Sequence, residues 1–63
     1  MNKKRNKMIE FRSNQSRIVV ARRLKITPQM LGAIERCDRT PSLELAKRIA
    51  DFYKTTIDVL FFD

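Results

Sequence analysis

The chain has 63 residues, the size of one small domain, and we expect a single domain over residues 1–63. Hydrophobic residues make up 43% and charged residues 33% of it, a balance typical of a globular protein. The chain contains no histidine and a single cysteine. Zinc and iron–sulfur sites and Ser-His or Cys-His nucleophile systems are therefore excluded within one chain. We expect a protein that is not an enzyme and that uses no cofactor, metal or small-molecule ligand.

Features that would direct the chain to a membrane or out of the cell are missing from the sequence. No apolar run approaches the roughly 18 residues of a membrane span, and the first residues lack the apolar region of a secretory signal. The single cysteine, Cys37, rules out an intrachain disulfide, which fits a reducing compartment. These observations predict a cytoplasmic protein with no membrane partner, in which Cys37 is an inert loop thiol.

Basic residues are concentrated in the first part of the chain. The whole chain has 14 Lys and Arg against 7 Asp and Glu, a net charge of +7. Residues 1–25 contain nine basic residues and one acidic residue, whereas residues 26–63 contain five basic and six acidic residues. A polyanion, most commonly a nucleic acid, is the natural partner of such a surface. Solubility alone is the other explanation of this charge.

Helix signals dominate, and no segment alternates as a half-buried strand would. We expect a first helix over residues 2–12, whose apolar residues are Met8, Ile9 and Phe11. Ser16 is the expected N-cap of a second helix that continues to about residue 24. One face of that helix is apolar and contains Val20, Ala21 and Leu24.

The sharpest local signal is Thr27 followed by Pro28, because Thr is a good N-cap and Pro is favoured at the first helical position. It predicts a third helix over residues 28–36. Ser42 is the expected N-cap of a fourth helix to about residue 53, and residues 57–61 form a short fifth helix. Together these segments predict a compact all-α domain of five helices, with a helix-turn-helix at about residues 16–36.

The third helix has two unlike faces at about 100° per residue. Small and polar residues occupy one arc, namely Pro28, Gln29, Gly32, Ala33 and Arg36, whereas Met30, Leu31, Ile34 and Glu35 occupy the opposite arc. A face of Gly and Ala lets the helix backbone approach a partner closely, and the Gln29 amide matches the N6/N7 edge of adenine. Alternatively, Gly32 and Ala33 are simply small surface residues, although Gly within a helix costs about 1 kcal/mol relative to Ala.

The fourth helix and the C-terminus contain more apolar surface than one small core absorbs. The expected core stripe of the helix is Leu43, Ala46, Ile49, Ala50 and Tyr53, with Leu45 and Phe52 to one side. The excess predicts a homodimer whose interface includes Phe52, Ile57, Phe61 and Phe62. The alternative is that the fifth helix folds back and covers these residues.

With this order of helices, the sequence resembles the lambda-repressor-like (Cro/repressor, Xre) helix-turn-helix family. The residues that match the family pattern are 16–36, 39–46, 49–50 and 57–61, and the likeness extends from about residue 8 to the C-terminus. The resemblance implies a sequence-specific transcription regulator, a repressor in our interpretation, that binds an inverted repeat in double-stranded DNA as a dimer. Its third helix, residues 28–36, would lie in the major groove.

Position by position, the resemblance also assigns roles to individual residues. The residues that would face bases are Thr27, Pro28, Gln29, Gly32 and Ala33. Arg17 stands where the family has a Gln that touches phosphate, and Arg36, Arg39 and Thr40 would hold the DNA backbone on the far side. Arg12 and Glu35 would form an ion pair under the third helix, unless both simply reach solvent.

The chain departs from the family at several positions. Lys25, Cys37 and Lys54 stand at turns where the family often has Gly, and each would cost roughly 1 kcal/mol if the turn needs a positive φ. Ile18 and Val19 are apolar where the family is usually polar, and the sequence offers no account of them.

Three other functions compete with DNA reading. The first is a protein-interaction module, such as the antitoxin of a toxin–antitoxin pair, that uses the surface from Phe52 to Phe62. The second is a non-specific nucleic-acid or RNA-binding protein, which would need a stacking platform that the C-terminal aromatics do not provide. The third is a membrane-surface helix, which has too few apolar residues to insert.

Overall fold

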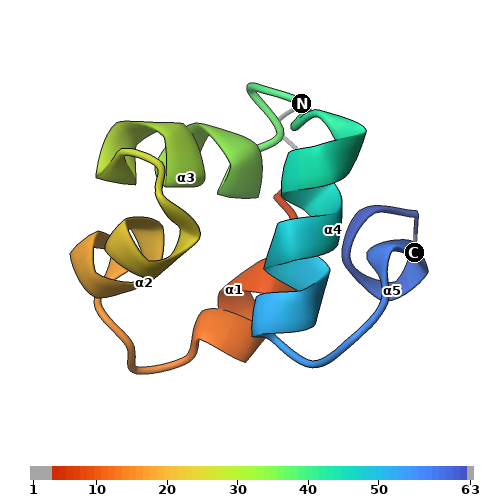
Figure 1. Cartoon of the computed structure of the whole chain (residues 1–63), viewed down its shortest axis with the longest axis horizontal. Coiled ribbons are helices and arrows are strands. Elements are labelled where there is room, and N and C mark those ends of the chain that lie inside the picture. The colour runs from red at the N-terminus through yellow and green to blue at the C-terminus, as the bar shows by residue number, and fades with distance from the viewer. Residues whose placement is uncertain (1–3, 63) are drawn as a thin grey trace.

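Residues 4–62 are described by the computed structural model, and they form five α-helices and no strand. The helices are α1 (Asn6–Arg12), α2 (Arg17–Leu24), α3 (Pro28–Glu35), α4 (Leu43–Phe52) and α5 (Ile57–Phe61) (Figure 1). The α2 helix packs on α3 and α4, the α5 helix packs on α4, and α1 contacts both α3 and α5. The predicted all-α class and the order of the helices are confirmed.

Helices α2, α3 and α4 begin at the predicted N-caps, and α5 begins after a further capping residue, Thr56. The hydroxyl of Ser16 accepts a hydrogen bond from the backbone N–H of Ile18, which lies two residues on. The other three capping hydroxyls, which belong to Thr27, Ser42 and Thr56, accept from an N–H three residues on. Each cap satisfies one backbone donor that a helix start leaves unpaired, so the predicted boundaries of these helices hold to within one residue.

The prediction for the first helix was wrong at its start. The helix begins at Asn6, and Lys4 and Arg5 precede it in a non-helical conformation, while residues 2 and 3 lie outside the described part. The backbone N–H of Arg5 donates to the carbonyl oxygen of Glu35 at 2.7 Å. This contact to the end of α3 binds the chain before α1 in place, and no local sequence pattern shows it.

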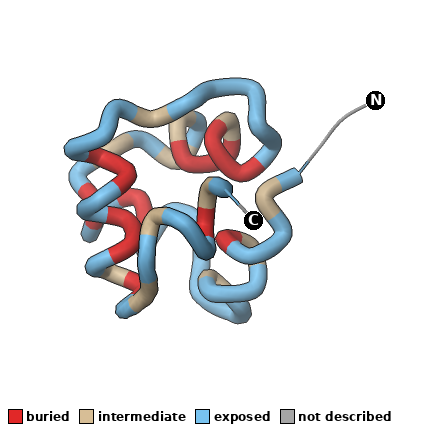
Figure 2. Tube along the Cα trace, turned by 90° about the vertical axis from the view of Figure 1, so that its right-hand side faces the viewer, coloured by how far each residue is buried: buried red, intermediate tan, exposed pale blue. Residues whose placement is uncertain are grey.

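The core lies where the inward faces of all five helices meet (Figure 2). It contains the predicted apolar face of α2 and the apolar arc of α3, with Met8 of α1 and Leu60 of α5. Its buried apolar residues are Met8, Val20, Ala21, Leu24, Leu31, Ile34, Leu45, Ala46, Ile49, Ala50, Tyr53 and Leu60. Because a chain of this length has room for one core only, each helix contributes just a few of these residues.

On α4 the predicted core stripe was wrong at one position. Leu43 is 76% exposed, whereas Leu45, which the stripe left out, is buried. Leu43 lies roughly 70° and Leu45 roughly 90° from the centre of the other four stripe residues, on opposite sides of it. The helical period therefore cannot choose between them, and the neighbouring helices decide which one is covered.

Within residues 4–62, four residues other than glycine adopt a positive φ. They include the three turn positions noted in the sequence, Lys25 at 62°, Cys37 at 63° and Lys54 at 58°, and also Ser13 at 52°. An L-residue pays roughly 1 kcal/mol or more there, because its Cβ crowds the neighbouring carbonyl oxygen. A domain of this size has a total stability of only about 3–9 kcal/mol, so these turns cost a sizeable part of it.

We therefore expect Lys25→Gly to raise the free energy of unfolding by about 1 kcal/mol, because Gly accepts this backbone conformation without strain. Urea denaturation followed by circular dichroism measures the change. The matched control is Lys47→Gly on the exposed side of α4, where the same substitution should lower the stability by about 1 kcal/mol. A loss of stability in both variants would contradict the strain at Lys25.

Candidate nucleic-acid interface

The turn between α2 and α3 is built by backbone geometry and one capping hydroxyl. Lys25 ends α2 in the left-handed conformation, and the next N–H, that of Ile26, donates back to the carbonyl oxygen of Ala21 at 2.9 Å. Thr27 then caps α3 by accepting from the N–H of Met30 at 3.0 Å. This short connection sets the angle at which α3 is presented beside α2.

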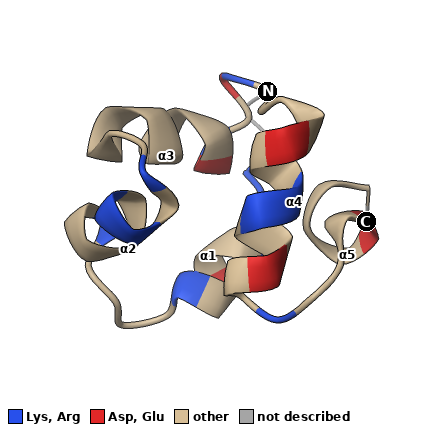
Figure 3. Ribbon diagram, viewed as in Figure 1, with Lys and Arg blue, Asp and Glu red and all other residues tan. Residues whose placement is uncertain are grey.

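The two faces of α3 lie as its sequence predicts. Leu31, Ile34 and Glu35 are buried, whereas the side chain of Gln29 is exposed and those of Pro28 and Ala33 are partly exposed. The helix contains no Lys or Arg within its bounds, so its outward face is neutral, while α2 beside it is basic (Figure 3). The exposed part of α3 thus offers an amide and small apolar groups to a partner.

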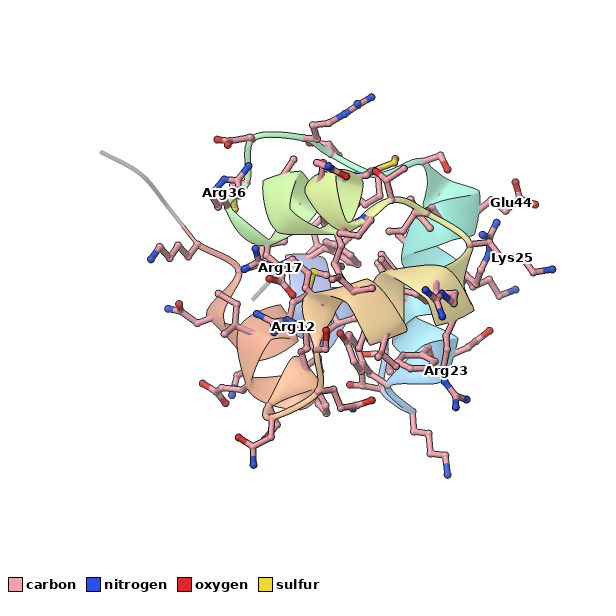
Figure 4. All side chains as sticks on the ribbon, turned by 90° about the vertical axis from the view of Figure 1, so that its left-hand side faces the viewer. Arg12, Arg17, Arg23, Lys25, Arg36 and Glu44 are labelled. Carbon is pink, nitrogen blue, oxygen red and sulfur yellow. The ribbon has the colours of Figure 1, made fainter. Side chains whose placement is uncertain are left out.

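Gly32 is buried because two arginine side chains cover it. A β-carbon at this position would lie 3.0 Å from Nη1 of Arg36 and 3.4 Å from Nη1 of Arg17. One arginine starts α2 and the other ends α3, and Figure 4 shows them on the same side of the molecule. A β-carbon here would require Arg36 to shift by a few tenths of an ångström and would leave Arg17 in ordinary contact, so Gly32 gives Arg36 the closer approach.

The position of Arg36 differs from the sequence prediction, which placed it with Arg39 on the far side of the interface. Its guanidinium lies beside that of Arg17, and its Nε donates to Oδ2 of Asp38 at 3.0 Å. Arg39 and Thr40 stay exposed in the loop between α3 and α4. The N–H of Arg39 is directed back to the carbonyl oxygen of Ala33 at 3.3 Å, which binds this loop to the end of α3.

Glu35 is the last residue of α3, and its side chain points into the domain, where the residue is 1% exposed. Both of its oxygens bind Arg12: Nε donates to Oε2 at 2.7 Å and Nη2 donates to Oε1 at 3.2 Å. A second cation, Nε of Arg17, lies 3.4 Å from Oε1. The hydrogen bond to Glu35 raises the pKa of Arg12 above its ordinary value, against the opposing effect of burial. A buried carboxylate needs such a partner, and the two cations leave the cluster with a net positive charge.

Tyr53 lies close to this cluster in the core. Burial, together with the negative charge of Glu35, raises the pKa of its phenol to about 12. The ring stacks on Phe11 with centroids 5.8 Å apart and meets Phe52 edge-on at 5.2 Å. The phenol therefore stays neutral at physiological pH, and it adds no charge beneath α3.

Two further arginines bind helix ends, and the sequence analysis missed them. Nε of Arg5 donates to the carbonyl oxygen of Ile34 at 2.9 Å, and Nη1 of Arg48 donates to that of Leu24 at 2.8 Å. Both contacts satisfy carbonyl groups at the C-terminal ends of helices, where a cation is also favoured by the helix dipole. The partners lie 29 and 24 residues apart in sequence, so no local signal could have found them.

The four residues predicted for a dimer interface lie in two places. Ile57, Phe61 and Phe62 line one groove of about 390 Å³ together with Leu43. Leu43 and Phe62 are each 76% exposed there. Phe52, at the other end of α4, lines a different groove with Phe11 and Val19. The fifth helix covers part of the apolar surface, since Leu60 is buried, but it leaves this first groove open.

We expect Glu35→Gln to lower the free energy of unfolding by about 3 kcal/mol, because it removes the charge that holds Arg12 in a partly buried site. Chemical denaturation gives the value. The control is Asp38→Asn, which breaks the exposed pair with Arg36 and should change stability by less than about 0.5 kcal/mol. Equal small changes in the two variants would show that the Glu35 cluster does not stabilise the fold.

The sequence matches the model of one protein family, described as a helix-turn-helix, over residues 14–60. No curated protein and no solved structure matches the chain significantly. Within the described residues, no helix is both long enough and apolar enough to cross a membrane. The matched residues include α2 and α3 with their turn, and the chain therefore belongs to the Cro/C1-type, Xre-like helix-turn-helix family of DNA-binding regulators.

Proposed function

We propose that this chain is a repressor that reads an inverted repeat in double-stranded DNA by inserting α3 into the major groove. The observation that supports this most directly is the outward face of α3, where an exposed amide and small apolar groups lie between basic residues. Such a face fits the major groove sterically and presents the Gln29 amide to base edges. A bound dimer would repress by covering its operator.

Base reading is assigned to the outward face of α3 and to its N-cap. The amide of Gln29 would donate to N7 and accept from N6 in the usual bidentate pairing with adenine, through its nitrogen and its oxygen respectively. Pro28, Ala33 and the methyl group of Thr27 would contact thymine methyl groups. Gly32 is covered by arginines, so we assign it a supporting role in which it makes room for them.

Phosphate binding is assigned to two groups of residues. Arg17 and Arg36 converge over Gly32 and would bind the DNA backbone on one side of the groove. Arg39 and Thr40, in the loop after α3, would bind it on the other side. These contacts would set the register and salt dependence of binding, and they would carry no sequence information directly.

The test of base reading is a selection from a random duplex pool, repeated with Gln29→Ala. We expect the variant to lose discrimination at one base pair in each half-site, by about 1–3 kcal/mol, and to keep it elsewhere. The contrasting variant is Arg17→Ala, which should weaken binding to all sequences about equally and lower the salt slope by about one unit. Uniform weakening by Gln29→Ala would remove Gln29 from base reading.

Dimer formation is assigned to the groove lined by Leu43, Ile57, Phe61 and Phe62. Two copies joined there would present their α3 helices to successive turns of one DNA face, about 34 Å apart. Phe52 is not included, because it lies in the other groove.

We expect Leu43→Asp to convert dimers to monomers in sedimentation velocity and to reduce affinity for an inverted repeat toward that for a half-site. Its side chain is 76% exposed at the start of α4, where a negative charge is tolerated by the helix dipole, so the fold should be kept. The control is Val19→Asp, an exposed apolar position outside this groove. A dimer that survives Leu43→Asp would place the interface elsewhere.

A further inference from the structure

A second groove lies at the junction of α1, α2 and the end of α4. Its volume is about 420 Å³ and it is shallow. Its floor is apolar and consists of Phe11, Val19, Phe52 and Tyr53. We refer to it as the Phe11–Phe52 groove. The role assigned to α3 in DNA reading leaves this groove unused, because α3 contributes no residue to it.

Two of the apolar side chains that line this groove, Phe11 and Val19, are exposed, whereas Phe52 is partly buried and Tyr53 is buried. Val19 is 46% exposed and Phe11 is 38% exposed, whereas the α2 residues Val20, Ala21 and Leu24 are buried. Ile18, the other exposed apolar residue of α2, lies outside the groove. Exposed apolar groups gathered in a concave surface are typical of a site that binds another molecule. Val19, which the sequence analysis left without an account, thus has a place in the structure.

The rim of the groove is basic. Arg23 and Lys54 lie on it with the neutral side chain of Gln15, and no acidic residue lines the groove. Both cations are exposed. Charge complementarity therefore favours an occupant with negative charge at its edges over a neutral or basic one.

The groove lies apart from the surface assigned to DNA. Arg17 and Arg36 are at the start of α2 and the end of α3, whereas Arg23 is near the other end of α2, and Figure 4 shows it well separated from both. A molecule in the groove therefore does not need to displace DNA from α3.

From the apolar and aromatic lining and the two cations on a rim without an acidic residue, we propose that the Phe11–Phe52 groove docks a partner protein through a short acidic segment that contains large apolar side chains. A second copy of this chain is a poor occupant, because a two-fold contact here would bring Arg23 and Lys54 near the same cations of the other copy. Single-stranded nucleic acid is also a poor occupant. Phe11 stacks on Tyr53 and Phe52 meets the same ring edge-on, so the Tyr53 ring is covered and the groove offers no row of free aromatic faces for successive bases.

The experiment is a selection of displayed random 12-residue peptides on the immobilised full chain, in the presence of excess duplex DNA that occupies the surface assigned to DNA. We expect enrichment of peptides that combine Asp or Glu with Leu or Phe. Synthetic versions of the enriched peptides should bind Val19→Asp at least about tenfold more weakly, because the new charge lies on the apolar floor and repels the acidic flanks. Arg23→Glu and Lys54→Glu should weaken binding in the same direction.

Matched controls come from neighbouring residues on the same helix. Ile18→Asp changes an equally apolar residue that is 56% exposed and does not line the groove, and Arg22→Glu changes an exposed cation outside it. Both controls should keep the peptide affinity within about twofold, which would exclude a general effect of charge. Amide shifts in NMR spectra would show that the variants remain folded.

Four outcomes would overturn the proposal. They are the absence of acidic peptides from the enriched pool, equal losses in Val19→Asp and Ile18→Asp, competition by a single-stranded oligothymidine, and loss of self-association in Val19→Asp. The proposal does not depend on base reading by α3. We expect Val19→Asp to bind duplex DNA as the unmodified chain does. A failure of peptide docking and a failure of DNA reading by α3 are therefore seen in different measurements.

Discussion

The carboxylate of Glu35 lies under α3 and binds Arg12 through both of its oxygens. This contact connects α1 to the last turn of α3 across the interior of the domain. A charge that is 1% exposed is tolerated only with such a partner, so the position of α3 depends on the pair staying formed. The same carboxylate also attracts Arg17 from the start of α2, which brings three helices to one point.

A domain of this size has a low free energy of unfolding. Contacts made by its arginines stabilise the fold in addition to the small core. Arg5 and Arg48 bind carbonyl groups at the ends of α3 and α2, and Arg12 neutralises Glu35. These arginines contribute to the net charge of the chain, but the contacts within the fold leave them less available to bind a polyanion. Four turns in residues 4–62 lower the stability, because residues other than glycine adopt a positive φ in them. The balance favours a fold that is well specified and only modestly stable.

The surface of the domain divides into three regions with different chemistry. The outward face of α3 is neutral and is flanked by arginines, the groove of Leu43 and Phe62 is apolar, and the Phe11–Phe52 groove is apolar with a basic rim. The first and third regions both include residues of α2, with Arg17 at its start in the one and Val19 and Arg23 further along it in the other. The core between them is shared, so a change in one region that loosens packing would be felt in the others.

The local sequence by itself determined where α2 to α5 begin. Their N-caps and the Thr27–Pro28 pair depend only on contacts within one turn of the chain. The helical period also separated the two faces of α3, with Gln29 outward and Glu35 inward. Tertiary structure alone decided the start of α1, the exposure of Leu43 rather than Leu45, and the meeting of Arg36 with Arg17 over Gly32. Each of these three features depends on contacts between residues far apart in the chain, or on which side of a helix is covered by a neighbouring helix. No spacing within a single element contains that information.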